Sequence, residues 1–388
     1  MKKYFLVLVV IATLLTGCSV FKENDSLSPK SKRALRNGNI YFAQQNLVKA
    51  RGFLVEVLED YPNHLEANKK MADIHYFEAE NNDKIAYESY LKAHDEYQIV
   101  YNQLKDVGRE DMSRDERRWY KDSRKKITSI HARILILANK EYELYKTEQI
   151  GDRDEIISKY YNLIDLEKDN LDPYKFLTVI LNNQKRDLRM AEGEDNEFEI
   201  SKLDNEILYL LSQWVRIDPN NLEDRTTYAK QLYALKRYDE AIEQANELIK
   251  QDPYNYDHYD LFASIAELQE DYQAAFDKME EANSLIPENV KIYGSLIYFA
   301  QKLKNNEAYL NYSKNLIEIE ASPENLSTFA SFLYTNKMWD DLLIYSEKWF
   351  MVDKKNKTPA QFAAFAAQKT KDTNKYNFYA KKYKELDS

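Results

Sequence analysis

Apolar residues in the middle of the chain recur at helical spacing. The segment Asp115–Thr147 places them three, four or seven residues apart, on one face of a helix. They are Ile127, Ile130, Ile134, Leu137 and Leu144. Asp83–Lys105 has the same character. The pattern therefore predicts two long helices in this part of the chain.

Prolines divide the C-terminal half into segments of nearly equal length. Their successive spacings are 34, 34, 36 and 36 residues, at Pro219, Pro253, Pro287, Pro323 and Pro359. Because proline cannot continue a helix interior, each one marks the end of a helix pair and the turn into the next. An unrelated bundle with coincident prolines would not readily produce two identical spacings of 34 residues.

Small and apolar residues recur in the same register as the prolines. The segment 222–255 carries Tyr228, Ala229, Leu232, Ala241, Ala245 and Leu248. The segment 256–289 carries Phe262, Ala263, Ala266, Ala275, Met279 and Ala282. The same pattern stands near the N-terminus at Gly38, Tyr41, Ala50, Leu54 and Pro62. In these positions the chain resembles the tetratricopeptide repeat family, whose period is 34 residues. Later segments match less well, since Ile297, Tyr309 and Phe332/Leu333 replace the small residues.

The resemblance implies an all-α fold, a superhelix (α-solenoid) of tetratricopeptide-like helical hairpins. In that family the inner helix of each pair lines a concave groove with residues not used for packing. In this chain those positions are Glu223, Thr226, Lys230 and Tyr233, then Asp257, Asp260, Ser264 and Glu267, then Lys291, Tyr298 and Gln301, and finally Tyr334 and Lys337. The lining is polar, mixed in charge and rich in tyrosine, so we expect it to bind an extended or helical peptide segment.

The first thirty residues have the pattern of an export signal. Met1-Lys2-Lys3 precedes an apolar run from Tyr4 to Leu15 that is too short to span a bilayer comfortably. Leu15-Thr16-Gly17-Cys18 resembles the lipobox of bacterial lipoproteins, and Cys18 is the only cysteine of the chain. The resemblance implies cleavage before Cys18 and acylation of that residue with chains such as palmitate. A signal-anchor with an incidental cysteine is the alternative, and the short apolar run disfavours it.

Residues 18–30 are polar and include Pro29, which predicts a flexible tether that reaches about 20 Å. We therefore expect the folded part to lie in the cell envelope beside a membrane. Ser19 is not the aspartate that retains enterobacterial lipoproteins at the inner membrane. The expected location is thus the outer membrane facing the periplasm in a host with two membranes, and the cell surface otherwise.

Composition narrows the possible functions. The formal net charge is −10, which argues against nucleic acid as a partner. Only 7 glycines occur in 388 residues, and none of them cluster into a loop that could hold a phosphate. The five histidines, His64, His75, His94, His131 and His258, form no metal-binding spacing and are expected to be exposed or partly buried. We expect no metal, no cofactor and no catalytic residues.

One basic cluster stands out in this acidic chain. It comprises Arg114, Arg117, Arg118, Lys121, Arg124, Lys125 and Lys126 around Trp119 and Tyr120. Such a cluster could meet an anionic lipid surface, peptidoglycan carboxylates or an acidic partner. A solvated helix face is favoured instead, because Asp115, Glu116 and Asp122 are interleaved with the cations.

The expected organisation is a signal peptide (1–17), a lipidated tether (18–30), an N-terminal repeat unit (31–82), enlarged hairpins (83–215) and a C-terminal repeat array (216–388). Asp172-Pro173 is expected to start a helix and 186–199 to be an exposed acidic loop. The expected function is a non-enzymatic scaffold for envelope proteins or peptides. Two alternatives remain. One is a small-ligand partner of a transporter, which requires an enclosed apolar pocket, with 83–215 as the candidate region, and the other is an enzyme that acts on the cell wall with paired carboxylates.

Overall fold

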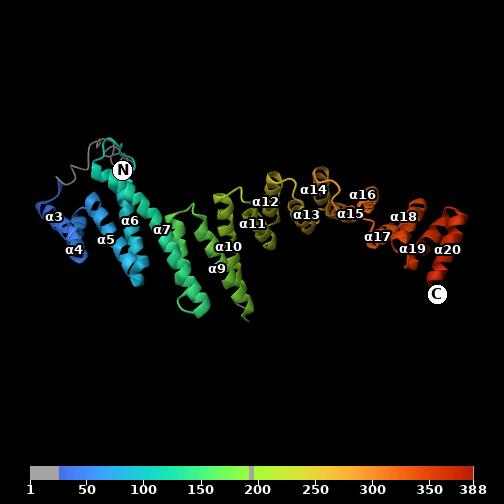
Figure 1. Cartoon of the computed structure of the whole chain (residues 1–388), viewed down its shortest axis with the longest axis horizontal. Helices are drawn as coiled ribbons and strands as arrows, with labels where there is room; N and C mark the ends of the chain where they lie inside the picture. The colour runs from blue at the N-terminus through green and yellow to red at the C-terminus, as the bar shows by residue number, and fades with distance from the viewer. Residues whose placement is uncertain (1–25, 192–195, 388) are drawn as a thin grey trace, which may run out of the picture. The chain divides into compact units, whose positions relative to one another are not determined.

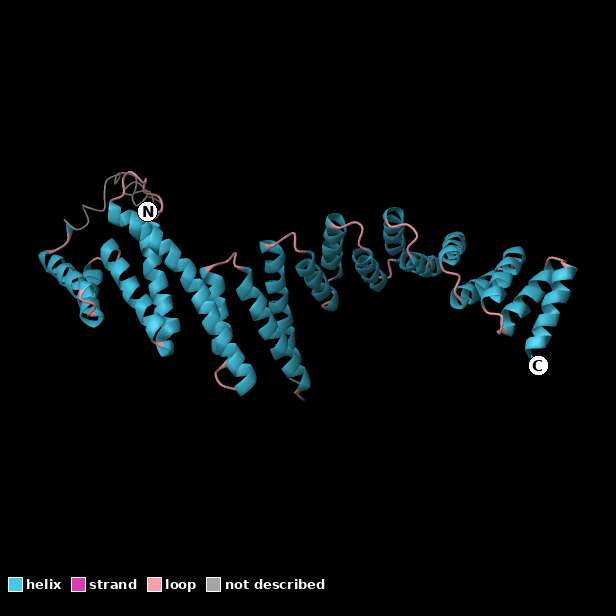
Figure 2. Cartoon of the chain, in the orientation of Figure 1, coloured by secondary structure: helices cyan, strands magenta, loops and turns pink. Residues whose placement is uncertain are grey.

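A computed structural model describes residues 26–191 and 196–387, and every regular element in these two ranges is a helix (Figures 1 and 2). The signal segment, Cys18 and the tether up to residue 25 lie outside the described residues. The expectation of a flexible tether is wrong for its end, because Leu27 is 4% exposed, Ser28 caps a helix and that helix begins at Pro29. The helices form two compact units that divide between Asn183 and Gln184, within one helix. That boundary falls inside the segment 83–215 rather than at either of its ends.

The first unit begins with two helix pairs and continues into longer helices. Its elements are α3 (Pro29–Ala43), α4 (Leu47–Asp60), α5 (Leu65–Asn81), the short η1 (Asp83–Ile85), α6 (Ala86–Leu104), α7 (Arg114–Glu148), α8 (Arg153–Leu166) and the first part of α9 (Leu171–Met190). Both long helices expected from the apolar spacing are confirmed as α6 and α7.

The second unit repeats one motif, a helix of 13 residues followed by a second helix of 14 or 15 residues. After the rest of α9 and α10 (Asn196–Ile217), the helices are α11 (Leu222–Ala234), α12 (Tyr238–Gln251), α13 (Tyr256–Leu268), α14 (Tyr272–Leu285), α15 (Val290–Lys302), α16 (Asn306–Ile319), α17 (Pro323–Thr335), α18 (Trp339–Val352), α19 (Lys357–Lys369) and α20 (Thr373–Asp387). The first helices of successive pairs start 34, 34, 33 and 34 residues apart. This regular period and the antiparallel pairing confirm an all-α, tetratricopeptide-like fold.

Fully buried small residues let the helices of this unit approach closely. Ala229, Ala241, Ala245 and Ala275 are 0% exposed, and Ala263 is 2% exposed. Because the alanine side chain is a single methyl group, the two helix axes can come close together at such a position. The positions expected from the repeat pattern are therefore the packing positions.

The pattern changes where Tyr309 takes the place of a small residue. The Tyr309 ring on α16 stacks on Phe332 of α17, with ring centroids 4.0 Å apart. Among the consecutive helices from α10 to α20, α16 and α17 share the least extensive close backbone contact. A large aromatic pair thus replaces the close helix contact at this junction.

Every turn inside a helix pair of the second unit contains one residue in the left-handed conformation. The φ angles lie between 56° and 60° at Lys236, Glu270, Lys304, Lys337 and Lys371. In each turn the next N–H bonds back to a carbonyl five residues earlier, as in Asn305 N to Ala300 O at 2.9 Å. This is the Schellman arrangement, which glycine usually occupies. The sequence contains no glycine at these turns, so their shared geometry was not apparent from composition.

The interpretation of residues 186–199 as an acidic loop is wrong. Helix α9 continues to Met190 and α10 starts at Asn196, and the side chain of Asn196 donates to Leu188 O at 2.9 Å. The charged residues of the two helix ends, Arg186, Asp187, Arg189, Glu197 and Glu199, are exposed, and residues 192–195 lie outside the described residues.

The expected helix start at Asp172-Pro173 is also displaced. Helix α9 begins at Leu171, and the side chain of Asn170 accepts from Asp172 N at 3.1 Å. Asn170 therefore acts as the cap, and Pro173 lies within the first turn, where its missing N–H does no harm.

None of the helices in the described ranges is long and apolar enough to cross a membrane.

Gly38 and Gly52 provide a matched pair of substitutions in the first unit. A Cβ on Gly38 of α3 would lie 3.0 Å from Leu54 Cδ2, whereas a Cβ on Gly52 of α4 would meet nothing within 4 Å. We expect Gly52→Ala to raise the free energy of unfolding by up to about 1 kcal/mol. Gly38→Ala should leave the free energy of unfolding unchanged or lower it, because the fully buried Leu54 side chain occupies the space that the new Cβ needs. Urea unfolding of both variants checks this, and an equal gain in both would contradict the close contact.

The left-handed turns generate a second stability prediction. Lys304→Gly should stabilise the protein by about 1 kcal/mol, because it removes the Cβ strain of a positive φ. Gln301→Gly, three residues earlier and inside α15, should destabilise it by a similar amount. Thermal unfolding of the two variants should therefore shift in opposite directions. A shift in the same direction would mean that position 304 is not left-handed in solution.

Candidate functional site

The residues expected to line a groove are all accessible. Glu223, Lys230, Asp257, Asp260, Lys291, Tyr298, Gln301, Tyr334 and Lys337 are exposed, while Thr226, Tyr233, Ser264 and Glu267 are half-buried. All of them lie on the first helices α11, α13, α15 and α17 except Lys337, which is in the turn after α17. We call this surface of the second unit the first-helix face.

Side chains link neighbouring first helices across this face. The Tyr256 hydroxyl on α13 lies 2.7 Å from Asp260 and 3.3 Å from Ser295 of α15, and the Lys291 ammonium lies 5.4 Å from the centre of the Tyr256 ring. Further along, Tyr298 of α15 donates to Glu267 of α13. These contacts join α13 and α15 into one continuous surface.

Tyr256 and Tyr298 stay neutral at ordinary pH. Burial, together with the hydrogen bond to Asp260, raises the pKa of Tyr256 to about 12. The hydrogen bond to Glu267 raises the pKa of Tyr298 as well. Each therefore presents an aromatic ring with a fixed hydroxyl donor.

An aromatic cluster extends the face to the fifth pair. The Tyr334 ring on α17 lies 5.1 Å from Phe365, 5.5 Å from Phe362 and 6.0 Å from Trp339, measured between ring centroids. Tyr334 is 43% exposed, so the cluster opens to solvent. Trp339, Phe362 and Phe365 were not among the residues expected to line this face. Continuing the register into α19 would have found Phe365, because it lies eight residues after the start of its helix, as Tyr298 does.

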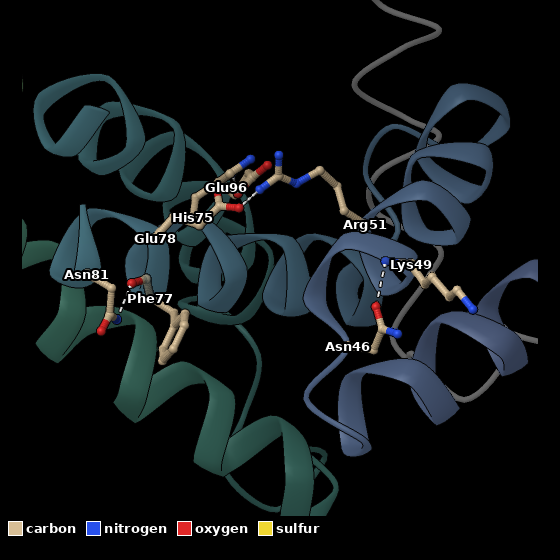
Figure 3. Close-up of polar contacts among 8 residues, drawn as sticks. All are labelled: Asn46, Lys49, Arg51, His75, Phe77, Glu78, Asn81 and Glu96. Carbon is tan, nitrogen blue, oxygen red and sulfur yellow. Dashed lines mark hydrogen bonds and ion pairs between the residues drawn. The ribbon is translucent and has the colours of Figure 1, made fainter. Parts of the chain in front are cut away.

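The first unit has a candidate site of another kind, an open groove of about 640 Å³ at the turns of its helix pairs. Five carboxamide side chains line it, together with Glu78 and four apolar side chains, Leu47, Val48, Phe77 and Ile85. The carboxamides are Gln44, Gln45, Asn46, Asn81 and Asn82. Asn46 uses its side-chain oxygen to cap α4, accepting from Lys49 N at 3.3 Å, and Asn81 donates to Phe77 O at 2.7 Å (Figure 3).

One ion pair joins the two helix pairs that form this groove. Arg51 reaches from α4 to Glu78 on α5, beside His75 and Glu96 (Figure 3). His75 Nδ1 lies 2.9 Å from Glu96 Oε2, and burial raises the pKa of the Glu96 carboxyl. Because Glu78 is engaged by Arg51, the lining is close to neutral. The groove is open and its lining is both polar and apolar, so it is not the enclosed apolar pocket that a small-ligand transporter partner requires.

The histidines are more buried than expected. All five are between 1% and 8% exposed, and they serve the packing of the helices. His64 caps α5, for example, and His131 Nδ1 lies 3.1 Å from Glu167. Burial lowers the pKa of both histidines, which keeps them neutral near pH 7. Among the described residues, no group of three or more histidines, cysteines or acids could hold a metal ion.

Helix pairs of constant period and a polar, tyrosine-bearing first-helix face define a tetratricopeptide-like array. No known family model and no curated protein matches the chain.

Several solved structures match it over about half its length. YrrB, described as a TPR protein with an unusual peptide-binding site, is 16% identical with a TM-score of 0.34, and the match covers 45% of this chain and 91% of that one. MamA from Desulfovibrio magneticus RS-1 is 15% identical with a TM-score of 0.33, over 48% and 96% of the two chains. PilF of Pseudomonas aeruginosa is 16% identical with a TM-score of 0.31, over 53% and 92%. Identities and scores this low say nothing about what the present chain binds.

Proposed function

We propose that this protein is a lipid-anchored, non-enzymatic scaffold that binds other proteins of the cell envelope through its first-helix face. The observation that carries the proposal is the continuity of that face. Side-chain contacts of tyrosines join the first helices α13 and α15, and an open aromatic cluster at Tyr334 joins α17 to α19.

The chemistry of the face fits a peptide segment or protein surface. Tyrosine rings supply contact area with few rotatable bonds, and their hydroxyls add direction. The charges are of both signs, for example Lys230 and Lys291 beside Asp257 and Asp260, which favours a partner of mixed charge over a polyanion.

Anchoring rests on the N-terminal sequence. The lipobox-like Leu15-Thr16-Gly17-Cys18 would place acyl chains on Cys18, and two or three such chains hold a protein almost permanently at a membrane. The partners are then exported proteins that share this compartment, and assisting their assembly is the role that such a tethered scaffold would serve.

Lipidation is tested at Cys18. In cells fed an alkyne analogue of palmitate, the wild-type chain should acquire the label and partition into detergent, whereas Cys18→Ser should not acquire it. Serine keeps the size of the side chain but cannot form the thioether. Labelling of Cys18→Ser equal to wild type would refute the anchor.

Binding is tested with paired tyrosine variants of the full chain. After crosslinking in intact cells, the detergent-solubilised wild type should co-purify with a small set of exported proteins. Tyr298→Ala/Tyr334→Ala should lose most of that set, because each truncation at a contact centre costs about 1–2 kcal/mol or more.

The matched control is Tyr254→Ala/Tyr376→Ala, which removes two exposed tyrosines outside the first-helix face. It should retain the partners. Equal retention by both double variants would show that binding does not use this face.

A further inference from the structure

The first half of α7 carries a row of exposed cations along one helix face. Arg114, Arg117, Arg118, Lys121, Arg124 and Lys125 follow one another at steps of three, one, three, three and one residues, and all six are exposed. At 1.5 Å per residue the row is about 16 Å long. We call it the basic stripe.

The acids interleaved with the stripe in sequence do not neutralise it. Glu116 is 4% exposed and closes a capping box with Ser113, whose N–H lies 2.5 Å from its carboxylate. The Asp122 carboxylate lies 2.9 Å from the buried Lys69 ammonium of α5, which Asp73 also contacts at 2.6 Å, so it pairs with a cation outside the stripe. Only Asp115 pairs with a stripe cation, Arg118, at 3.4 Å.

Charged residues near the stripe do not cancel its excess of positive charge. The loop before α7 contributes Asp106, Glu110 and Asp111 against Lys105 and Arg109. These charges nearly balance, so the surplus belongs to the helix. The solvated face of mixed charge expected from the sequence thus carries an excess of cations, and Asp115 is the interleaved acid that pairs with one of them.

Apolar groups are turned away from the stripe. Trp119 and Tyr120 pack against a buried cluster with Leu65 and Val100, and the Tyr120 ring stacks on Tyr101 with centroids 5.4 Å apart. Lys126 lies over the Tyr76 ring, 3.3 Å from its centre, and so faces inward. The stripe therefore presents cations with no aromatic or aliphatic anchor among them.

We propose that the basic stripe docks the first unit on an anionic phospholipid surface. A protein interface is depleted in charge at its centre and built around buried anchors, and the stripe has neither property. Mobile anionic headgroups can gather beneath a fixed row of cations without such anchors. The inference goes beyond the proposed scaffold and rests on it in one respect, because the tether would hold the stripe within reach of the membrane.

The test uses the full chain reconstituted into vesicles, with a donor dye on Thr128→Cys and an acceptor on the lipid headgroups. Thr128 is exposed on α7, three residues beyond the last stripe cation. Energy transfer should be stronger in vesicles of equal parts phosphatidylcholine and phosphatidylglycerol than in phosphatidylcholine alone, and high salt should remove the difference.

Lys121→Gln/Arg124→Gln/Lys125→Gln should lower the ratio of docked to undocked protein about 100-fold, so that the anionic lipid no longer increases the transfer. Lys250→Gln/Lys354→Gln/Lys355→Gln removes the same charge from exposed positions of the second unit and should leave the transfer at the wild-type level. Equal effects of the two triple variants, or no difference between the two lipids, would overturn the proposal. So would loss of an acidic co-purifying protein from the stripe variant with unchanged lipid transfer.

Flotation of the same samples separates this inference from the anchor. Failure to float with phosphatidylcholine alone, together with salt-sensitive flotation with phosphatidylglycerol, would refute the anchor and support the stripe. Flotation with both lipids, together with equal energy transfer in the two, would support the anchor and refute the stripe.

Discussion

The arrangement of the second unit depends on how closely its helices can approach. Fully buried alanines such as Ala229, Ala241 and Ala275 let each helix lie against its neighbours in the chain. Since apolar surface at these contacts is fully removed from water, packing decides which side of each first helix turns inward. The opposite side, with Tyr298 and Tyr334, is left to solvent, and the candidate binding face is therefore a direct result of the packing. Where Tyr309 replaces a small residue, the close contact is exchanged for an aromatic stack.

Residues that act through packing could be predicted from the sequence. The repeat period, the buried alanines and the long helices α6 and α7 follow from periodicity, because burial leaves a regular trace in the order of residues. The accessible positions of the first helices followed from the same register. The aromatic neighbours of Tyr334 were missed because two of them, Phe362 and Phe365, lie in the next pair, where the register had not been carried through.

Features that depend on partners distant in sequence could not be predicted. Asp122 looked like a neutralising neighbour of the basic cluster, but it pairs with Lys69, about fifty residues earlier in the chain. The histidines looked accessible because nothing near them in sequence indicates burial, yet His75 and His131 meet Glu96 and Glu167 on other elements. The acidic segment 186–199 was taken for a loop since charge does not distinguish a helix end from a turn. The left-handed turns escaped notice because Lys and Glu occupy positions that glycine usually marks.

Contacts in the second unit join mainly helices that follow one another in the chain, from α10·α11 through to α19·α20. An array of this kind has no long-range contact that must break before the rest can yield. A pulling force applied across the unit would therefore meet a series of small, similar resistances rather than one large barrier, and the α16–α17 junction would give way early. A scaffold with such compliance could lengthen under load while most of its helix pairs, and the partners bound to them, stay in place.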